Sequence, residues 1–261
     1  MPAPINTFKT ALKAGETLIG CWVGLADAYA AEIMTTAGFD WLLIDGEHAP
    51  NDLRSMVSQL QVIQPSNSHA VVRLPVGDTV KMKQILDGGA QTVLVPMIES
   101  ADQARQIVRD TQYPPVGVRG VGASLARASR FGEISDYAKT ADDQICLLLQ
   151  VENRAGMAAL DDILAIDEVD GVFIGPADLA ADMGHIGNAS HPDVKKAVED
   201  CLTRIVASGK AAGILATDLN AAQRFIDLGA TFVAVGIDVT LFAGAARDLA
   251  AKGAALKPTP V

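Results

Sequence analysis

The chain has 261 residues, of which 49% are hydrophobic, 20% are charged and few are aromatic, a composition typical of soluble globular proteins. Its net charge of -10 argues against a surface for nucleic acid or an anionic membrane, although local arginines can still bind a small anion. No apolar run approaches the roughly 18 residues that a membrane span requires, and the N-terminus lacks the pattern of a signal peptide. We therefore expect a cytoplasmic protein.

The three cysteines, Cys21, Cys146 and Cys201, are far apart in the sequence and form no CxxC pair. Cys21 and Cys146 lie in apolar runs, so we expect them to be reduced and buried. This expectation agrees with a reducing compartment.

Short apolar runs alternate with longer amphipathic segments along the whole chain. The apolar runs predict strands at 18–25, 41–44, 70–74, 92–95, 145–152, 171–175, 211–216 and 232–236. The segments between and after them predict helices at 27–37, 51–64, 79–87, 100–111, 155–165, 192–208, 219–228 and 241–251. Asp27, Asn51 and Ser100 stand where the first residue of a helix needs a side-chain acceptor, and we predict that they cap their helices.

Eight strand–helix units of about 30 residues, with no linker between them, predict an α/β fold, a (β/α)8 TIM barrel that spans residues 1–261 as a single domain. A doubly wound open sheet is the alternative. It fits less well because Leu25, Ala26 and Asp27 follow the first strand, where that fold would have a glycine-rich phosphate turn.

One long irregular segment, from Tyr113 to about Asp143, interrupts the alternation. It carries three arginines, Arg119, Arg127 and Arg130. Loops of this length in compact domains are usually functional or disordered.

The predicted fifth strand ends in Gln150 and Glu152. Side chains two residues apart on a strand point to the same face, so an amide and a carboxylate emerge together at the end of a buried strand. A buried carboxylate is costly unless it finds a cation, a proton or hydrogen-bond donors. We therefore predict that Glu152 binds a metal ion.

Polar side chains also follow other strands at their C-terminal ends, where barrel enzymes build their sites. Collected from four strands, they are Asp45, Glu47, His48, Arg73, Gln150, Glu152 and Asp178. Taken alone, an aspartate in a segment with glycine and proline, such as Asp178 after Gly175 and Pro176, is most often a turn former or a helix cap. Because these polar side chains are expected to converge on one mouth of the barrel, a functional site is favoured.

The residue types indicate the chemistry of that site. Glu152 and Asp178, with no cysteine nearby, favour a hard cation such as Mg²⁺ or Mn²⁺ over structural zinc. Such a cation would act as a Lewis acid on a 2-oxo acid and acidify its adjacent C–H bond. His48 is the predicted proton carrier, and Arg73 would stabilise an enolate oxygen.

The positions of the lysines argue against a different aldolase chemistry. An imine mechanism needs a lysine at the mouth. No lysine ends a predicted strand there, and Lys210 begins the seventh strand at the opposite end. Schiff-base catalysis is therefore not expected.

Three segments resemble the signatures of the HpcH/HpaI aldolases, and within that family the 4-hydroxy-2-oxoheptanedioate aldolases. They are residues 41–48 (WLLIDGEH), 117–122 (GVRGVG) and 171–178 (GVFIGPAD). The resemblance extends from about residue 18 to residue 250, and includes 94–97, 150–152 and 232–236. It implies a metal-dependent, class II pyruvate aldolase on a (β/α)8 barrel.

The resemblance also implies roles for individual residues. Glu152 and Asp178 would hold the divalent cation, Mg²⁺ or Mn²⁺ with Co²⁺ as a further candidate. His48 would be the base, and Asp87 the carboxylate that raises its basicity. The donor would contact Arg73 at its enolate, Gln150, and the backbone of Ala177 and Asp178.

The implied reaction is the reversible cleavage of a 4-hydroxy-2-oxo acid, through a metal-chelated enolate. Its products would be pyruvate or hydroxypyruvate and an aldehyde such as succinic semialdehyde or glyceraldehyde. The implied assembly is a homohexamer, a dimer of trimers that exchanges the last helix between neighbours. Two alternatives stay open, a lyase of the malyl-CoA type, which would need a basic groove, and a non-catalytic barrel that binds an acidic metabolite, which would need no base.

Overall fold

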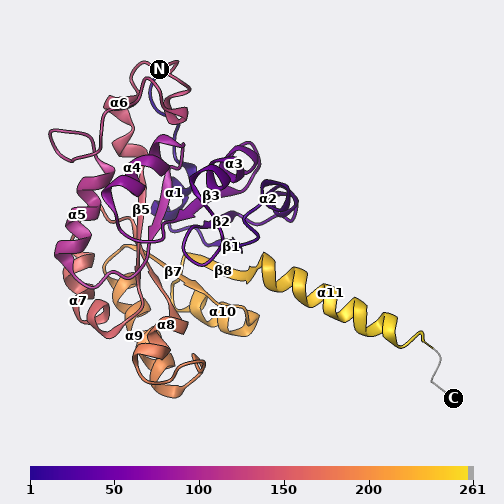
Figure 1. The fold of residues 1–261 in the computed structure, drawn as a ribbon. Coiled ribbons are helices and arrows are strands. Elements are labelled where there is room, and N and C mark those ends of the chain that lie inside the picture. The colour runs from indigo at the N-terminus through magenta and orange to yellow at the C-terminus, as the bar shows by residue number, and fades with distance from the viewer. Residues whose placement is uncertain (258–261) are drawn as a thin grey trace.

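Eight parallel strands pair in chain order, and the last closes onto the first, in the computed structural model, which describes residues 1–257 (Figure 1). The strands are β1 (Leu18–Val23), β2 (Trp41–Asp45), β3 (His69–Arg73), β4 (Thr92–Val95), β5 (Cys146–Val151), β6 (Gly171–Ile174), β7 (Ala211–Leu215) and β8 (Phe232–Ile237). The predicted barrel is confirmed, and the open-sheet alternative is wrong because the sheet closes.

Helices surround this barrel and connect successive strands. They are α1 (Thr7–Lys13), α2 (Ala28–Thr35), α3 (Leu53–Ile63), α4 (Thr79–Asp87), α5 (Ala101–Thr111), α6 (Tyr137–Thr140), α7 (Arg154–Leu164), α8 (Pro176–Asp182), α9 (Pro192–Ala207), α10 (Leu219–Asp227) and α11 (Asp238–Ala254), with short 3₁₀ turns at Arg127–Ser129 and Asp142–Gln144. The sequence had not indicated α1, α6 or α8, which are too short to establish a period. Pro176 at the first position of α8 was the available signal for that helix.

Two of the three predicted helix caps are confirmed. The side chains of Asp27 and Ser100 accept backbone N–H groups of the first turns of α2 and α5. The predicted cap Asn51 is wrong, because Asp52 caps α3. Asn51 instead donates its side-chain amide to the carbonyl oxygen of Asp45, at 2.8 Å, and so ties the start of α3 to the end of β2.

Aromatic side chains fill the barrel interior below the mouth. They pack in one buried cluster of Phe8, Trp22, Trp41, Phe173 and Phe232. Phe8 enters from α1 and meets Trp41 edge-on, with ring centroids 6.1 Å apart. A Cβ on Gly20 would overlap the Trp41 ring, so glycine is required for this packing. The N-terminal end of the barrel is thus filled, and the open end is the mouth at the strands' C-terminal ends.

A second, larger apolar core lies between the strands and the surrounding helices. All three cysteines are buried and free, which confirms the prediction for Cys21 and Cys146. Burial raises the pKa of Cys21 to about 12 and that of Cys201 to about 11, so both thiols are un-ionised and unreactive at neutral pH. None of the helices within residues 1–257 is long and apolar enough to span a membrane.

The last helix, α11, leaves the barrel and projects away from it (Figure 1). Its first residue, Asp238, is buried, and its carboxylate accepts the backbone N–H of Gly24 at 2.7 Å. Beyond this anchor the helix exposes large apolar side chains, including Leu241, Phe242 and Leu249. It begins three residues earlier than the predicted 241–251 because Asp238 continues directly from β8.

Candidate active site

An arginine between two carboxylates forms one side of the mouth. Asp45 and Arg73 end the neighbouring strands β2 and β3 in register. The guanidinium of Arg73 donates from Nε and Nη2 to the two Asp45 oxygens, at 2.9 and 2.7 Å, and Nη1 lies 2.9 Å from Glu47 Oε2. Burial opposes ionisation of Asp45, but the hydrogen bonds and charge of Arg73 hold the pKa of Asp45 below its ordinary value. The guanidinium also lies 5.4 Å from the centre of the Trp22 ring.

His48 stands at the solvent rim of the same side. Its side chain is 67% exposed, and its Nε2 lies 3.9 Å from Glu47 Oε2. Its backbone N–H donates to Asp45 Oδ1 at 3.3 Å, so the turn after β2 is fastened to the arginine pair. Burial raises the pKa of Glu47, although the charges of Arg73 and His48 oppose this.

Gln150 and Glu152 form the opposite side, at the end of β5. Both are buried, and the Gln150 amide donates to Glu152 Oε2. The other Glu152 oxygen accepts the backbone N–H of Met97 at 2.8 Å. A Cβ on Gly175 would lie 2.8 Å from Glu152 Cβ and 3.0 Å from Gln150 Nε2. The end of β6 therefore needs glycine to pack against these two side chains.

Glu152 is electrostatically unlike Asp45. Burial raises the pKa of Glu152 to about 7, and the negative charges of Asp178 and Glu47 raise it further, against the hydrogen bonds from Met97 and Gln150. Within residues 1–257, no lysine, arginine or histidine pairs with it at ion-pair distance.

Asp178 lies in the exposed first turn of α8, three residues after Gly175. The helix-cap alternative for Asp178 is wrong, because Gly175 occupies the cap position. The side-chain oxygen of Gln150 is buried and has no hydrogen-bond partner among residues 1–257. A buried carboxylate whose pKa is raised by neighbouring carboxylates, beside an unpartnered amide oxygen, offers hard donors that fit a divalent cation.

A cavity of about 350 Å³ joins the two sides of the mouth. Its walls include six of the residues predicted at the mouth, which are Asp45, His48, Arg73, Gln150, Ala177 and Asp178. Glu152 is not among the residues that line this cavity, but its carboxylate is hydrogen-bonded to Gln150 of the wall. Apolar residues complete the lining, among them Trp22, Leu215 and Ile237. Sequence reasoning missed them because it searched strand ends for polar groups only.

The family profile of the HpcH/HpaI aldolases and citrate lyases matches residues 18–245. The chain belongs to the HpcH/HpaI aldolase/citrate lyase family. A hydroxypyruvate/pyruvate aldolase of Roseovarius nubinhibens is 62% identical to it over 252 residues, which are 97% of this chain and 98% of that protein. A 4-hydroxy-2-oxo-heptane-1,7-dioate aldolase of Escherichia coli is 56% identical over 247 residues, 95% of this chain and 94% of that protein.

Solved structures agree with the family assignment. The crystal structure of an HpcH/HpaI aldolase/citrate lyase family protein from Burkholderia cenocepacia superposes with a TM-score of 0.91 at 40% identity, and covers 95% of this chain and 98% of that one. The family and its full-length aldolase relatives identify the chain as a carbon–carbon lyase.

Asp87, which the family resemblance pairs with His48, lies elsewhere in the chain. It is the last residue of α4, a helix that runs from the mouth after β3 down to the start of β4 at the opposite end of the barrel. There Asp87 accepts a hydrogen bond from Arg119 Nη2 at 3.0 Å. Arg119 is fully buried, with its guanidinium 4.4 Å from the centre of the Tyr113 ring. Asp87 therefore does not lie at the mouth of its own barrel, where His48 stands.

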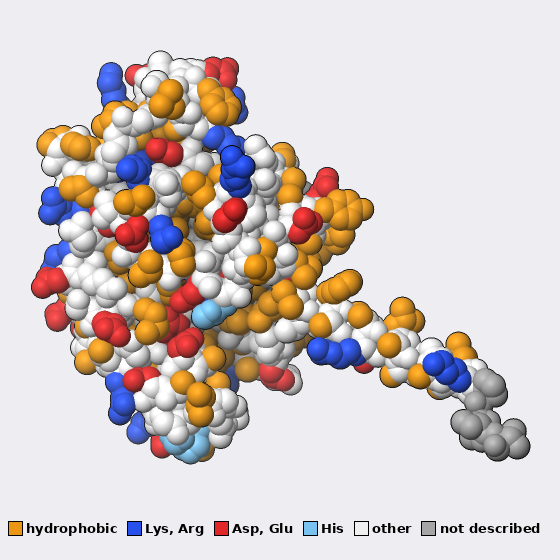
Figure 2. Space-filling view, in the orientation of Figure 1, with side chains coloured by type: hydrophobic (Ala, Val, Ile, Leu, Met, Phe, Trp, Pro, Cys, Tyr) orange, Lys and Arg blue, Asp and Glu red, His pale blue; other side chains and the backbone are white. Residues whose placement is uncertain are grey.

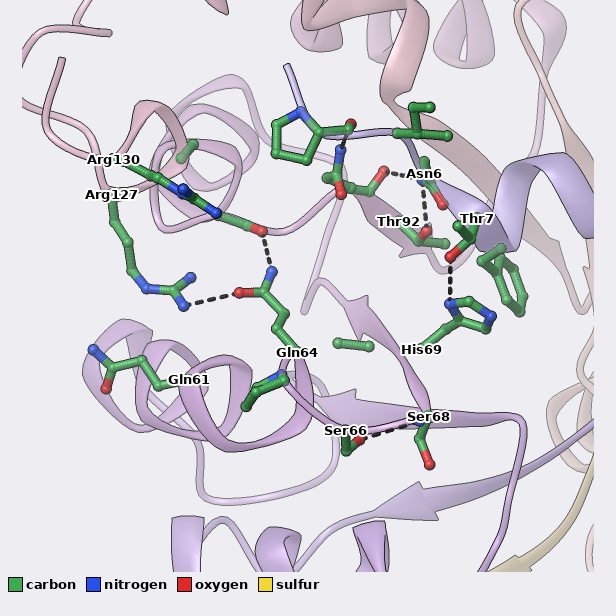
Figure 3. Close-up of a pocket in the computed structure, with 18 of the residues that line it drawn as sticks. Asn6, Thr7, Gln61, Gln64, Ser66, Ser68, His69, Thr92, Arg127 and Arg130 are labelled. Atoms are coloured by element: carbon green, nitrogen blue, oxygen red, sulfur yellow. Dashed lines mark hydrogen bonds between the residues drawn. The ribbon is translucent and has the colours of Figure 1, made fainter. Parts of the chain in front are cut away.

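A larger cleft of about 790 Å³ lies near the starts of β3 and β4, and none of the predicted site residues lines it (Figure 3). Its Arg127 donates to the Gln64 side chain at 2.8 Å and to the carbonyl oxygen of Gly88 at 3.0 Å. These partners follow the C-terminal ends of α3 and α4, where a cation stabilises helices. A structural role therefore accounts for Arg127, one of the arginines that the long irregular segment had made conspicuous.

Proposed function

We propose that this enzyme reversibly cleaves 4-hydroxy-2-oxo acids to pyruvate or hydroxypyruvate and an aldehyde, with a divalent cation. The observation that carries the proposal is the cavity in which His48, Arg73 and Gln150 converge beside Glu152. Relatives at 62% and 56% identity that are named for pyruvate and 4-hydroxy-2-oxo acid aldolases support it. The aldehyde partner, succinic semialdehyde or glyceraldehyde among others, stays open.

The donor molecule would bind between the two sides of the mouth. The backbone N–H groups of Ala177 and Asp178 belong to the first turn of α8 and have no partner within the helix, so they are free to bind a carboxylate of the donor. Arg73 faces the same cavity from β3. Its fixed positive charge would stabilise negative charge that develops on the donor oxygen during cleavage.

Glu152 and Asp178 would hold the cation, for which Mg²⁺, Mn²⁺ and Co²⁺ are the candidates. The buried Glu152 carboxylate, whose pKa the charge of Asp178 helps to raise, and the unpartnered oxygen of Gln150 support this assignment. When bound, the cation would polarise the donor carbonyl and acidify the adjacent C–H bond. Glu152 has to lose its proton to act as a ligand, and its pKa of about 7 makes this proton part of the binding equilibrium.

His48 would move the proton of the 4-hydroxyl group. In the cleavage direction it accepts this proton, directly or through a water, and in synthesis it returns it. Its exposure at the rim suits a group that must meet aldehydes of different sizes.

Asp87 can support His48 only from a neighbouring chain, since the two lie at opposite ends of one barrel. We therefore propose a homohexamer, a dimer of trimers, in which residues 1–261 form one aldolase domain and α11 packs on a neighbour. The exposed apolar residues of α11 support this arrangement (Figure 2). The three buried, reduced cysteines agree with a cytoplasmic location.

Subunit complementation tests the role of Asp87. Chains carrying His48→Ala and chains carrying Asp87→Asn are expected to be inactive alone and to regain activity when co-expressed, because some mixed interfaces hold both native residues. The matched control combines His48→Ala with Arg73→Ala, two changes on one side of the same mouth, and is expected to stay inactive. If the first mixture also stays inactive although mixed oligomers form, Asp87 does not serve a neighbour's His48.

Proton exchange tests the proposed reaction before the aldehyde is known. In D₂O, the methyl protons of pyruvate should exchange when the protein and Mg²⁺ are both present, as followed by NMR. Full chelation of the metal should stop the exchange. A protein that binds pyruvate but never exchanges its protons would be a binding barrel, and exchange that survives chelation would contradict the metal-dependent proposal.

A further inference from the structure

Three metal-ligating side chains gather outside the active site, in the connection from α8 to α9. They are His185, His191 and Asp193, and one potential ligand atom of each lies within 4.8 Å of the others. In Figure 2, histidine side chains mark the tip of the molecule where Figure 1 places this connection. None of the three lines the cavity at the mouth.

The two imidazole rings face one carboxylate. They are stacked, with centroids 3.6 Å apart and planes 13° apart. His185 Nε2 and His191 Nδ1 lie 3.9 and 3.7 Å from the same oxygen of Asp193. Two protonated rings at this separation would repel each other, and a single carboxylate compensates one charge only.

The hydrogen bonding shows where a lone pair of His191 points. His191 Nδ1 accepts the backbone N–H of Asp193 at 3.2 Å, which requires a lone pair on that nitrogen. A neutral imidazole is the form that binds transition metals. Capping of α9 explains the position of His191, but it does not explain why His185 is stacked on the same ring and directed at the same carboxylate.

The connection itself is a hydrogen-bonded turn. The backbone N–H of His185 donates to the carbonyl oxygen of Ala180 at 2.7 Å, and that of Asn188 to His185 at 2.9 Å. The N–H of His191 then donates to Asn188 at 3.1 Å. Gly184, with φ of +85°, makes the left-handed residue that the turn needs. The backbone therefore holds both rings on one side before any ion arrives.

We propose that His185, His191 and Asp193 form a second divalent-metal site, which takes an imidazole-preferring transition ion such as Zn²⁺, Ni²⁺ or Co²⁺ rather than Mg²⁺. Bonds of about 2.0–2.1 Å place the ligand atoms of a tetrahedral ion roughly 3.4 Å apart. The nitrogen–oxygen separations of 3.7 and 3.9 Å are close to this value. To bind one ion, the two rings would turn out of their parallel stack, and His191 Nδ1 would exchange the N–H of Asp193 for the ion. Water completes the coordination on the exposed side.

The site ties together two helices, one of which reaches the mouth. Asp178 is in the first turn of α8 and His185 follows its last turn, roughly 10 Å further along the helix. An ion shared by His185 and the start of α9 would fix the far end of α8. The proposal does not depend on the aldolase reaction, because binding alone tests it.

Stoichiometry separates this site from the one at the mouth. We titrate metal-free full-length protein with Ni²⁺ by calorimetry, with and without saturating Mg²⁺ to occupy the oxygen donors at the mouth. The wild type is expected to bind two Ni²⁺ per chain without Mg²⁺ and to keep one with Mg²⁺. Glu152→Gln is expected to keep the ion held by the histidines.

His185→Ala and Asp193→Asn should each weaken the Mg²⁺-resistant site at least tenfold, since even outer-shell partners of a metal contribute about 10- to 100-fold. His69→Gln, which changes a histidine outside the cluster, is the matched control and should bind like the wild type. Circular dichroism verifies that each variant folds. The proposal is overturned if both cluster variants bind Ni²⁺ as the wild type does, or if Mg²⁺-saturated wild type binds Ni²⁺ no tighter than about 0.1 mM.

Discussion

The two sides of the mouth differ in whether their buried carboxylates are paired with a positively charged side chain. On the β2–β3 side, Arg73 meets Asp45 through two hydrogen bonds and reaches Glu47 as well, so every charge has a partner from the protein. On the β5–β6 side, Glu152 is equally buried but is neighboured by further carboxylates, and its pKa rises to about 7. One side carries its own cation, and under the proposed function the other receives one from solution.

Removing the protein's own cation should have the largest effect. Arg73→Ala leaves Asp45 buried and unpaired, which costs about 3–5 kcal/mol of folding free energy, and turnover should be lost with it. Arg73→Lys keeps the charge but not the paired hydrogen bonds, and should recover part of the stability. Urea denaturation of both variants measures the difference; a loss below about 1 kcal/mol for Arg73→Ala would mean that the pair is not effectively buried.

Ionisation of Glu152 should destabilise the metal-free protein. Its folded pKa, about 7, lies above the ordinary 4.5, so the unfolded chain releases this proton first and the free energy of unfolding falls between about pH 5 and 7. The difference of pKa corresponds to on the order of 3 kcal/mol. Glu152→Gln removes this component, so denaturation of both proteins from pH 5 to 8 should show a steeper fall in the wild type. Parallel curves would contradict the raised pKa.

Glycine at position 175 should matter to the metal side alone. In Gly175→Ala, the new Cβ would approach Glu152 Cβ to 2.8 Å, and such overpacking costs roughly 1–3 kcal/mol. We expect weaker Mg²⁺ binding from displacement of Glu152, while the Arg73 pair stays intact. Gly184→Ala, at the far end of α8, is the control for general destabilisation and should leave Mg²⁺ affinity at the mouth unchanged.

The two sides also differ in how far the sequence predicts them. The period of two placed Gln150 and Glu152 on one face, and strand ends placed Arg73 and Asp178 at the same mouth. Which carboxylate pairs with Arg73 was not predictable, because the strand register that sets Asp45 beside Arg73 is a property of the closed sheet.

Other features depend on tertiary structure, which the local sequence pattern does not indicate. Asp87 resembled a catalytic carboxylate by motif, but its position follows from the direction in which α4 runs along the barrel. The stack of His185 on His191 is created by a turn whose hydrogen bonds span residues 180–191. Single-residue signals such as Pro176 were present for α8, yet a helix of one or two turns leaves no period to detect.

The pH dependence of Mg²⁺ affinity tests most directly whether Glu152 is built for a cation from solution. Because the proton and the cation compete for this carboxylate, the affinity should fall about tenfold for each pH unit below 7 and level off above it. Calorimetric titration with Mg²⁺ from pH 5.5 to 8.5 measures this, with Glu152→Gln as the variant expected to bind weakly at every pH. An affinity that stays constant from pH 5.5 to 8.5, or that is retained in Glu152→Gln, would contradict the account.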